Sequence, residues 1–397
     1  MNKVNQKLRA IILVAALTAS STVVAKTDAI NIVQSGGESA RITAVVSNST
    51  PLFVSKRLGK LSDIVIYKGD CKEVSKQLKR QTACIESKEA SEILVSVPES
   101  LNKVKISRIN SQLSTELSPK QEISVTKAIY KALTSKDESI FDTKVAYISR
   151  HDNGKYILRV SDYDGSSPET IHESYEPILT PNWSPDGKYL TYVSFESVRS
   201  SIFIQDIKTK RRIKALTLRG LNAYPSFNNS ESLLVSISKE KSTSEIYRYD
   251  IPTSKLTLMK SSKRADIFPR RIDSETYVKV GLSGNDTPYA YVVRNGNQKP
   301  ISSLPLNAIS ASSNGDIVGL SGSKLVLLTK KGESWSDMQE IQTDPNIESP
   351  SISSNGEAIY YSTKENGRVF IKMASNKGKN ILSFMINNED LIQISAL

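Results

Sequence analysis

Residues suited to catalysis are scarce in this chain of 397 residues. Its two histidines are His151, in the turn-like sequence HDNG, and His172, in a strand-like run. A serine hydrolase needs a histidine base and a reactive serine, which in many hydrolases lies in a G-x-S-x-G turn. The sequence contains no such turn, and both histidines are explained more simply as polar turn or outer-strand residues. We therefore predict that the protein is not an enzyme and needs no cofactor.

Cysteines and paired aspartates are the next candidates for chemistry. Cys71 and Cys84 stand 13 positions apart. In an oxidising compartment they could form a disulfide, and closing this loop would contribute about 3 kcal/mol through the unfolded state. The alternative is a pair of buried free thiols. Asp162 and Asp164, in the sequence DYDG, lack the other spaced ligands of a calcium loop, so a strand-ending turn is the simpler interpretation and no metal site is predicted.

The second half of the chain contains a motif that is typical of a strand followed by a tight turn. Residues 181–187 read P-x-W-S-P-D-G. Pro185 presets the turn, Asp186 caps it locally, and Gly187 accepts positive φ, so one apolar strand can fold straight back on the next. The motif therefore predicts a β-hairpin.

The motif recurs at regular intervals. Pro225 and Pro269 each follow the preceding repeat proline by 44 residues, and a related S-S-N-G turn occurs at residues 312–315 and 353–356. Periods of about 40 to 45 residues with several short strands each are typical of propeller blades. About six such units fit between residue 143 and the end of the chain. We therefore predict an all-β six-bladed β-propeller over residues 141–397, with an open β-sandwich as the alternative.

The ends of the repeat region predict how the ring closes. The first unit begins directly with the strand-like run at residues 144–149 and has no proline-containing strand before it. The chain ends with the β-branched run Leu391–Ile394, which has no partner in its own unit. We expect this run to be the innermost strand of the first blade, which would remove an exposed sheet edge.

The N-terminus and the charge indicate an exported protein. Residues 1–25 contain three basic residues, then an apolar run and the sequence VVA, which is typical of a cleaved signal peptide. The apolar run is about half of a membrane span, and no later segment is long enough to cross a bilayer. Cleavage would remove three positive charges and lower the net charge from +12 to +9. This surplus would favour anionic envelope partners over nucleic acid in the periplasm, unless it serves solubility alone.

Residues 26–140 read as a separate α/β domain. Cys71, Val74 and Leu78 lie on one face of a short helix. A second helix begins with Ser118 as N-cap, and Pro119 and Gln121 complete its start signal. Its expected apolar positions are Val125, Ala128, Ile129, Ala132 and Leu133. The expected strands are Ala29–Val33, Arg41–Val46, Ile64–Tyr67, Glu92–Val97 and Val104–Ile109.

Three segments point to a known family. They are LRVSDYDG at residues 158–165, the block from Pro181 to Ser197, and IYKALT followed by FDTKVAYIS at the junction of the two domains. Together with the signal peptide, the small N-terminal domain and the six units, they make the sequence resemble the TolB family, the periplasmic component of the Tol-Pal system. Arg271 and Ala311 stand where the motif has Trp183, so the fourth and fifth repeats depart from the pattern.

The resemblance implies a scaffold. TolB-like proteins bind the lipoprotein Pal at one mouth of the propeller channel and offer an N-terminal segment to TolA, in a pathway that maintains the outer membrane and draws it inward during division. The resemblance also implies a monomer with possible further envelope partners. The TolA-binding residues carried over by position are Lys26, Thr27, Asp28, Ile30, Ile32, Val33 and Gly36.

The Pal-binding residues carried over in the same way lie beside the proline of each repeat. They are Leu179, Thr180, Leu221, Asn222, Tyr224, Ile267, Phe268, Arg270, Glu348 and Ser349. The family tends to have small or polar groups where this chain has Leu221, Ile267 and Phe268, which suggests a partner with a matching change.

Two other functions remain open at this level. The propeller could be an accessory to an exported peptidase, or it could bind carbohydrate. A carbohydrate-binding propeller would expose aromatic residues around its channel, and Tyr224 and Phe268 are suitable residues for that role.

Overall fold

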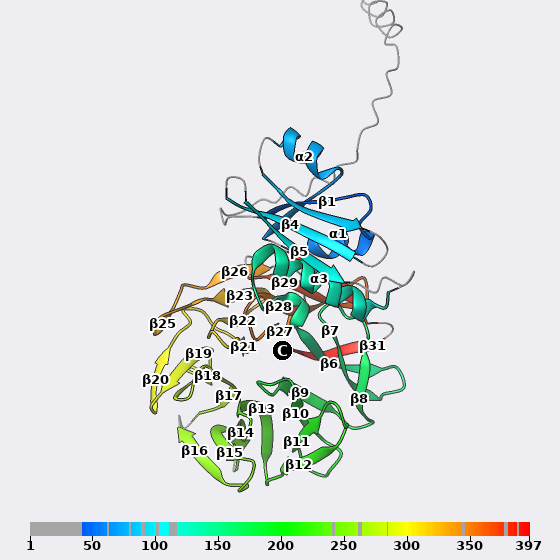
Figure 1. Cartoon of the computed structure of the whole chain (residues 1–397). Helices are drawn as coiled ribbons and strands as arrows, with labels where there is room; N and C mark the ends of the chain where they lie inside the picture. The colour runs from blue at the N-terminus through cyan, green and yellow to red at the C-terminus, as the bar shows by residue number, and fades with distance from the viewer. Residues whose placement is uncertain are drawn as a thin grey trace, which may run out of the picture.

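The computed structural model of the chain describes residues 42–397, apart from gaps at 62, 79–80, 89–91, 101–102, 111–116, 240–242, 261–263, 284, 343–345, 377–379 and 387–388. Within these residues an N-terminal α/β part precedes a six-bladed β-propeller (Figure 1), which confirms the predicted fold class. The expected signal peptide, the expected strand at 29–33 and the TolA-binding residues lie outside the described residues. No described helix is long and apolar enough to cross a membrane.

The N-terminal part is built on a five-stranded sheet in the order β2-β1-β3-β4-β5. Its strands are β1 (Ile42–Val46), β2 (Ile64–Lys68), β3 (Ala83–Lys88), β4 (Glu92–Ser100) and β5 (Lys103–Asn110). Its helices are α1 (Leu52–Leu58), α2 (Cys71–Gln77) and α3 (Pro119–Thr134). Helix α1 and strand β3 were not expected from the sequence. Helix α1 has only seven residues and no side-chain cap, and β3 reads ACIESK, with little apolar alternation.

Helix α3 begins where its capping residues predict. The Gln121 N–H donates to Ser118 Oγ, and the Ser118 N–H donates to Gln121 Oε1. Its buried face was predicted only in part: Ile129 and Leu133 are buried, whereas Val125, Ala128 and Ala132 are half-buried. The remaining buried positions are Ile123, Thr126 and Tyr130. The face is turned toward Tyr130 because this ring packs edge-on against Phe141, at the start of the propeller.

The 3₁₀ turn η1 (Ile140–Asp142) leads into six four-stranded antiparallel sheets. From the innermost strand outward, blade 1 consists of β31 (Glu389–Ala396), β6 (Lys144–His151), β7 (Tyr156–Asp162) and β8 (Glu169–Ser174). Blade 2 consists of β9 (Ile178–Trp183), β10 (Tyr189–Ser194), β11 (Ser201–Asp206) and β12 (Arg212–Leu216). Blade 3 consists of β13 (Leu221–Asn229), β14 (Ser232–Ser238), β15 (Glu245–Asp250) and β16 (Leu256–Lys260).

Blade 4 consists of β17 (Asp266–Arg271), β18 (Thr276–Leu282), β19 (Pro288–Arg294) and β20 (Asn297–Pro300). Blade 5 consists of β21 (Ile309–Ala311), β22 (Ile317–Ser321), β23 (Lys324–Leu328) and β26 (Gln339–Gln342). Blade 6 consists of β27 (Glu348–Ile352), β28 (Ala358–Glu365), β29 (Arg368–Ser375) and β30 (Asn380–Met385). A small hairpin, β24 (Lys330–Lys331) and β25 (Ser334–Trp335), precedes β26. The six innermost strands contact one another in a ring around the channel.

The C-terminal strand closes this ring. Figure 1 shows β31 beside β6, with the C-terminus at the centre of the ring. The two strands pair antiparallel from Glu389 opposite His151 to Ala396 opposite Val145. Trp183 Nε1 also donates to the backbone oxygen of Ser395 at 3.0 Å, which ties β31 to the second blade.

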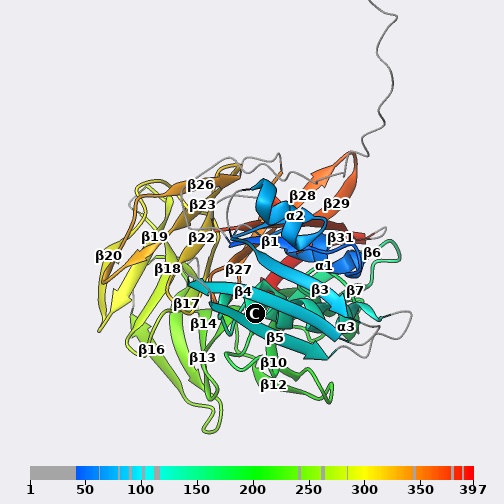
Figure 2. The same ribbon diagram turned by 45° about the horizontal axis from the view of Figure 1, so that its top comes forward.

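The N-terminal part packs on one face of the propeller, against the turns of blades 1 and 6 (Figure 2). From α1, Arg57 Nη1 donates to Asp164 Oδ2 at 2.5 Å and Nη2 donates to Glu122 Oε2 at 3.0 Å. Lys136 Nζ lies 3.3 Å from Glu357 Oε1 in the turn after β27. Burial opposes ionisation of Asp164, but hydrogen bonds from Ser166 and Arg57 outweigh it and lower the pKa of this carboxyl. Asp164 therefore joins the two parts of the chain.

We predict that removing residues 391–397 destroys cooperative unfolding or causes aggregation, because it exposes the edge of β6 and removes the wall between blades 6 and 2. Thermal unfolding followed by circular dichroism and light scattering measures this. The control is Leu397→Ala, which keeps the strand pairing and should lower the free energy of unfolding by no more than about 2 kcal/mol. Unchanged melting of the truncated protein would contradict the role of β31.

Candidate interaction site at the distal mouth of the channel

Four innermost strands share one distortion. Thr180, Tyr224, Phe268 and Ser349 each precede a proline, and each has a φ between 49° and 53°. This left-handed conformation costs a residue with a side chain about 1–2 kcal/mol. Strain of this kind persists only where the surrounding structure enforces it, and it gathers at functional sites.

Proline explains why the distortion occurs at these positions. It has no N–H to donate to a neighbouring strand, so a bulge at that position avoids a missing hydrogen bond. Pairing of β13 with β14 skips from Ala223 to Ser226, and pairing of β17 with β18 skips from Ile267 to Arg270. A bulge changes the direction of the side chain that it contains. The repeat prolines therefore turn one side chain of each strand away from the regular pleat.

These bulges lie toward the mouth of the channel farther from the N-terminal part, which we call the distal mouth. The turns after the innermost strands mark the nearer end: Asn355, in the turn after β27, contacts the backbone oxygen of Ser139, and Gly187, in the turn after β9, is close to Leu397. Thr180, Tyr224, Phe268 and Ser349 all come earlier in their strands. No ion pair described between the two parts of the chain reaches these positions.

Tyr224 and Phe268 form the main feature of the distal mouth. Their ring centroids are 4.3 Å apart, and the ring planes are tilted by 48°. Both side chains are half-buried, and burial raises the pKa of the Tyr224 hydroxyl. Two bulky residues in strained conformations thus make one aromatic surface from two different blades. We call it the aromatic pair.

The other sequence-predicted residues have different surroundings. Leu221 and Glu348 are exposed, and Leu179, Ile267 and Ser349 are half-buried. Thr180 Oγ1 is buried without a hydrogen-bond partner among the described residues. Arg270 lies deeper, in the wall of the channel.

Asn222 requires a correction. It is fully buried, and its Nδ2 donates to the backbone oxygens of Leu218 and Ser200 at 2.9 and 3.0 Å. Its Oδ1 accepts the Leu218 N–H at 3.2 Å. The side chain holds the loop before β13 and cannot contact a partner in this structure.

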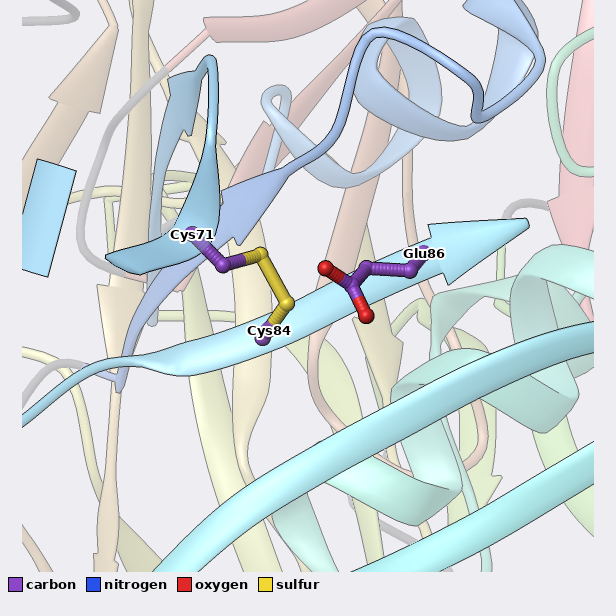
Figure 3. A group of neighbouring side chains, drawn as sticks. All are labelled: Cys71, Cys84 and Glu86. Carbon is purple, nitrogen blue, oxygen red and sulfur yellow. A yellow bond between two sulfur atoms is a disulfide. The ribbon is translucent and has the colours of Figure 1, made fainter. Parts of the chain in front are cut away.

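The other candidate chemical groups lie away from this mouth. Cys71 and Cys84 form a disulfide between α2 and β3, with Glu86 beside it (Figure 3). Although the three side chains are close enough to share a metal ion, bonded sulfurs are not thiolate ligands. His172, in the outer strand β8, accepts from Arg212 Nη1 at 2.8 Å and stacks on Tyr192, and burial lowers its pKa.

We predict that Thr180→Gly leaves the free energy of unfolding unchanged or raises it by up to about 1 kcal/mol, because relief of strain exceeds the entropic cost of glycine. The matched control is Thr257→Gly in β16, which has negative φ and should lose about 0.5–1 kcal/mol. Urea denaturation measures both. Equal destabilisation of the two variants would show that Thr180 is not strained.

Known proteins resemble this chain over the propeller and beyond. The model of the TolB beta propeller domain matches residues 130–393. The Tol-Pal system protein TolB of Ruthia magnifica is 33% identical over 233 residues, which are 57% of this chain and 51% of that protein. The TolB of Xylella fastidiosa strain M12 is 48% identical over 99 residues, which are 24% of this chain and 22% of that protein. These alignments span about half or less of the curated relatives.

A solved structure extends the similarity of fold to the N-terminal part. The crystal structure of TolB from Acinetobacter baumannii superposes with a TM-score of 0.72 at 23% identity, and covers 93% of this chain and 98% of that one. At this identity the superposition establishes the fold alone. Since the family model matches well over half of the residues, the chain belongs to the TolB β-propeller family.

Proposed function

We propose that this protein is a periplasmic scaffold of a Tol-Pal system. It binds the lipoprotein Pal at the distal mouth of the propeller and TolA through its N-terminal segment, and it thereby supports outer-membrane integrity and constriction during division. The role is one of binding and involves no catalysis. Family membership supports the pathway, and the aromatic pair on strained backbone supports the Pal site.

The distal mouth has the properties of a protein-binding surface. Binding energy at interfaces is concentrated in a few aromatic or arginine side chains that become fully buried, surrounded by residues that exclude water. The aromatic pair is already half-buried, so a partner needs to cover only its outer part. The two rings come from neighbouring blades and contact each other, and the strained backbone conformation of Tyr224 and Phe268 is already present without a partner. Little ordering of these side chains therefore remains to oppose association.

We predict that Tyr224→Ala and Phe268→Ala each raise the Kd for the cognate Pal domain at least tenfold, since such anchors typically contribute about 2 kcal/mol or more. Calorimetry on folded variants measures this. The matched control is Tyr189→Ala, which removes an exposed tyrosine at the start of β10, on the opposite face of the propeller, and should leave the Kd unchanged. An unchanged Kd in both aromatic variants would place Pal on another face.

We also predict that removing residues 26–34 abolishes TolA binding and leaves Pal binding intact or stronger. The sequence of this segment carries Ile30, Ile32 and Val33 before a Ser-Gly-Gly joint, which suits addition of a strand to a partner's sheet. A pull-down with the TolA C-terminal domain compares the truncated and full chains after export. Pal binding serves as the internal control for folding, and undiminished capture of TolA would refute the segment's role.

Carbohydrate binding is the second candidate, because the aromatic pair could also stack on a sugar ring. A glycan array separates the two functions. Glycan binding that is lost in Tyr224→Ala, together with no measurable affinity for Pal, would favour the carbohydrate function.

A further inference from the structure

Side chains of the innermost strands join neighbouring blades around the channel. Asn182 Oδ1 accepts the Phe227 N–H of the next blade at 3.0 Å. Ser351 Oγ accepts the Ala396 N–H at 2.9 Å. Asn182 and Ser351 each follow a repeat proline directly, and both act as hydrogen-bond acceptors. An acceptor at this position therefore helps to hold the ring together.

Arg270 occupies the same position after Pro269, but it cannot act in this way. A guanidinium has five N–H donors and no acceptor. Arg270 Nη1 donates to the backbone oxygen of Pro269 at 2.9 Å, and among the described residues no carboxylate pairs with it. Closure of the ring therefore does not explain why Arg270, a hydrogen-bond donor, stands where other blades have an acceptor.

The guanidinium lies in the wall of a cavity within the channel. The cavity has a volume of about 170 Å³, and all six innermost strands contribute to it. Ser184, Ser354 and Leu397 also border it, so it extends toward the end of the channel nearer the N-terminal part. Its lining includes hydroxyls on the two neighbouring strands, Ser226 in β13 and Ser310 in β21, and no aspartate or glutamate side chain. Arg271 also borders the cavity, but it is exposed and its Nε donates to the backbone oxygen of Asp273.

Arg270 remains charged at neutral pH although its surroundings disfavour the charge. Burial lowers the pKa of this group to about 10. A charge removed from water destabilises a protein unless an opposite charge or hydrogen bonds compensate it. A small anion in the cavity would supply both.

We propose that the propeller channel of this protein binds a carboxylate group at Arg270, with the hydroxyls of Ser226 and Ser310 beside it. The planar guanidinium matches the two oxygens of a carboxylate. Among the described residues that line this cavity, Arg270 is the one half-buried cation, and its single positive charge matches the single negative charge of a carboxylate. The carboxylate belongs either to a small free acid or, resting on the proposed function, to an acidic side chain of Pal.

Thermal unfolding of the purified protein with acetate as the probe tests the proposal, at constant ionic strength with chloride as the balancing salt. Saturating acetate should raise the Tm of the wild type by about 2 °C or more, because a ligand that binds only the folded state stabilises it. Arg270→Gln should show no acetate effect, and without acetate it should melt above the wild type because it lacks the uncompensated charge. The matched control, Arg248→Gln, changes an exposed arginine of β15 and should respond to acetate as the wild type does.

Three results would overturn the proposal. They are an acetate response in Arg270→Gln equal to that of the wild type, no response in the wild type, and a response to sulfate or phosphate without one to acetate. If Arg270→Gln does not fold, Arg270→Lys replaces it, because lysine keeps the charge but lacks the planar fork. Calorimetry should then show an acetate Kd at least fivefold above that of the wild type, and an equal Kd would contradict the assignment.

Competition between acetate and Pal identifies the source of the carboxylate. If Pal supplies it, acetate should weaken Pal binding to the wild type but not to Arg270→Gln. If a free acid is the ligand, Pal and acetate should bind independently. Because the acetate titration involves no partner, it can fail or succeed regardless of whether Pal binds this protein.

Discussion

Pairing of the first and last strands of the propeller is the constraint on which the rest of the structure depends. Strand β31 completes blade 1 and also contacts both neighbouring blades: Ala396 donates to Ser351 on one side, and Trp183 donates to Ser395 on the other. Ser349 Oγ donates to the backbone oxygen of Ile392, so β31 also supports one of the strained residues of the distal mouth. Without this strand the channel would lose one wall, and the edge of β6 would be left unpaired.

Closure of the ring allows strain to be kept at its mouth. A free strand could relax a left-handed Tyr224 or Phe268 by changing its register, but a strand held between two blades and a partner within its own sheet cannot. The strained positions are not equivalent, since blades 3 and 4 carry the aromatic rings and blades 2 and 6 carry Thr180 and Ser349. Blade 5 has only the short β21, with no proline. The mouth is therefore asymmetric, and a partner must bind it in one orientation.

Local patterns predicted most of the architecture, and long-range contacts account for what they missed. The period of the repeats, the capping box of α3 and the unpartnered C-terminal run each depend on neighbouring residues, so they could be read directly. Arg57 and Asp164 are 107 positions apart, and no spacing rule would pair them. Asn222 lies beside a repeat proline like its exposed neighbours, but the loop at residues 218–220 takes up its amide group. Positive φ at a tyrosine and a phenylalanine contradicts local preference, and such conflicts are expected at functional sites.

The joint between the two parts of the chain and the closure of the ring form one packing unit. A single apolar core contains Val54 and Leu58 of α1, Leu133 of α3, Val145 of β6 and Ile394 of β31. Loss of the N-terminal part would therefore uncover the strands that close the ring, and an open ring would remove the surface on which α1 and α3 pack. Phe268 of the aromatic pair packs against a different apolar cluster, shared by blades 4 and 5, and Tyr224 contacts Phe268. The aromatic pair therefore lies outside the apolar core that joins the two parts of the chain, so a substitution in the pair should leave that core intact.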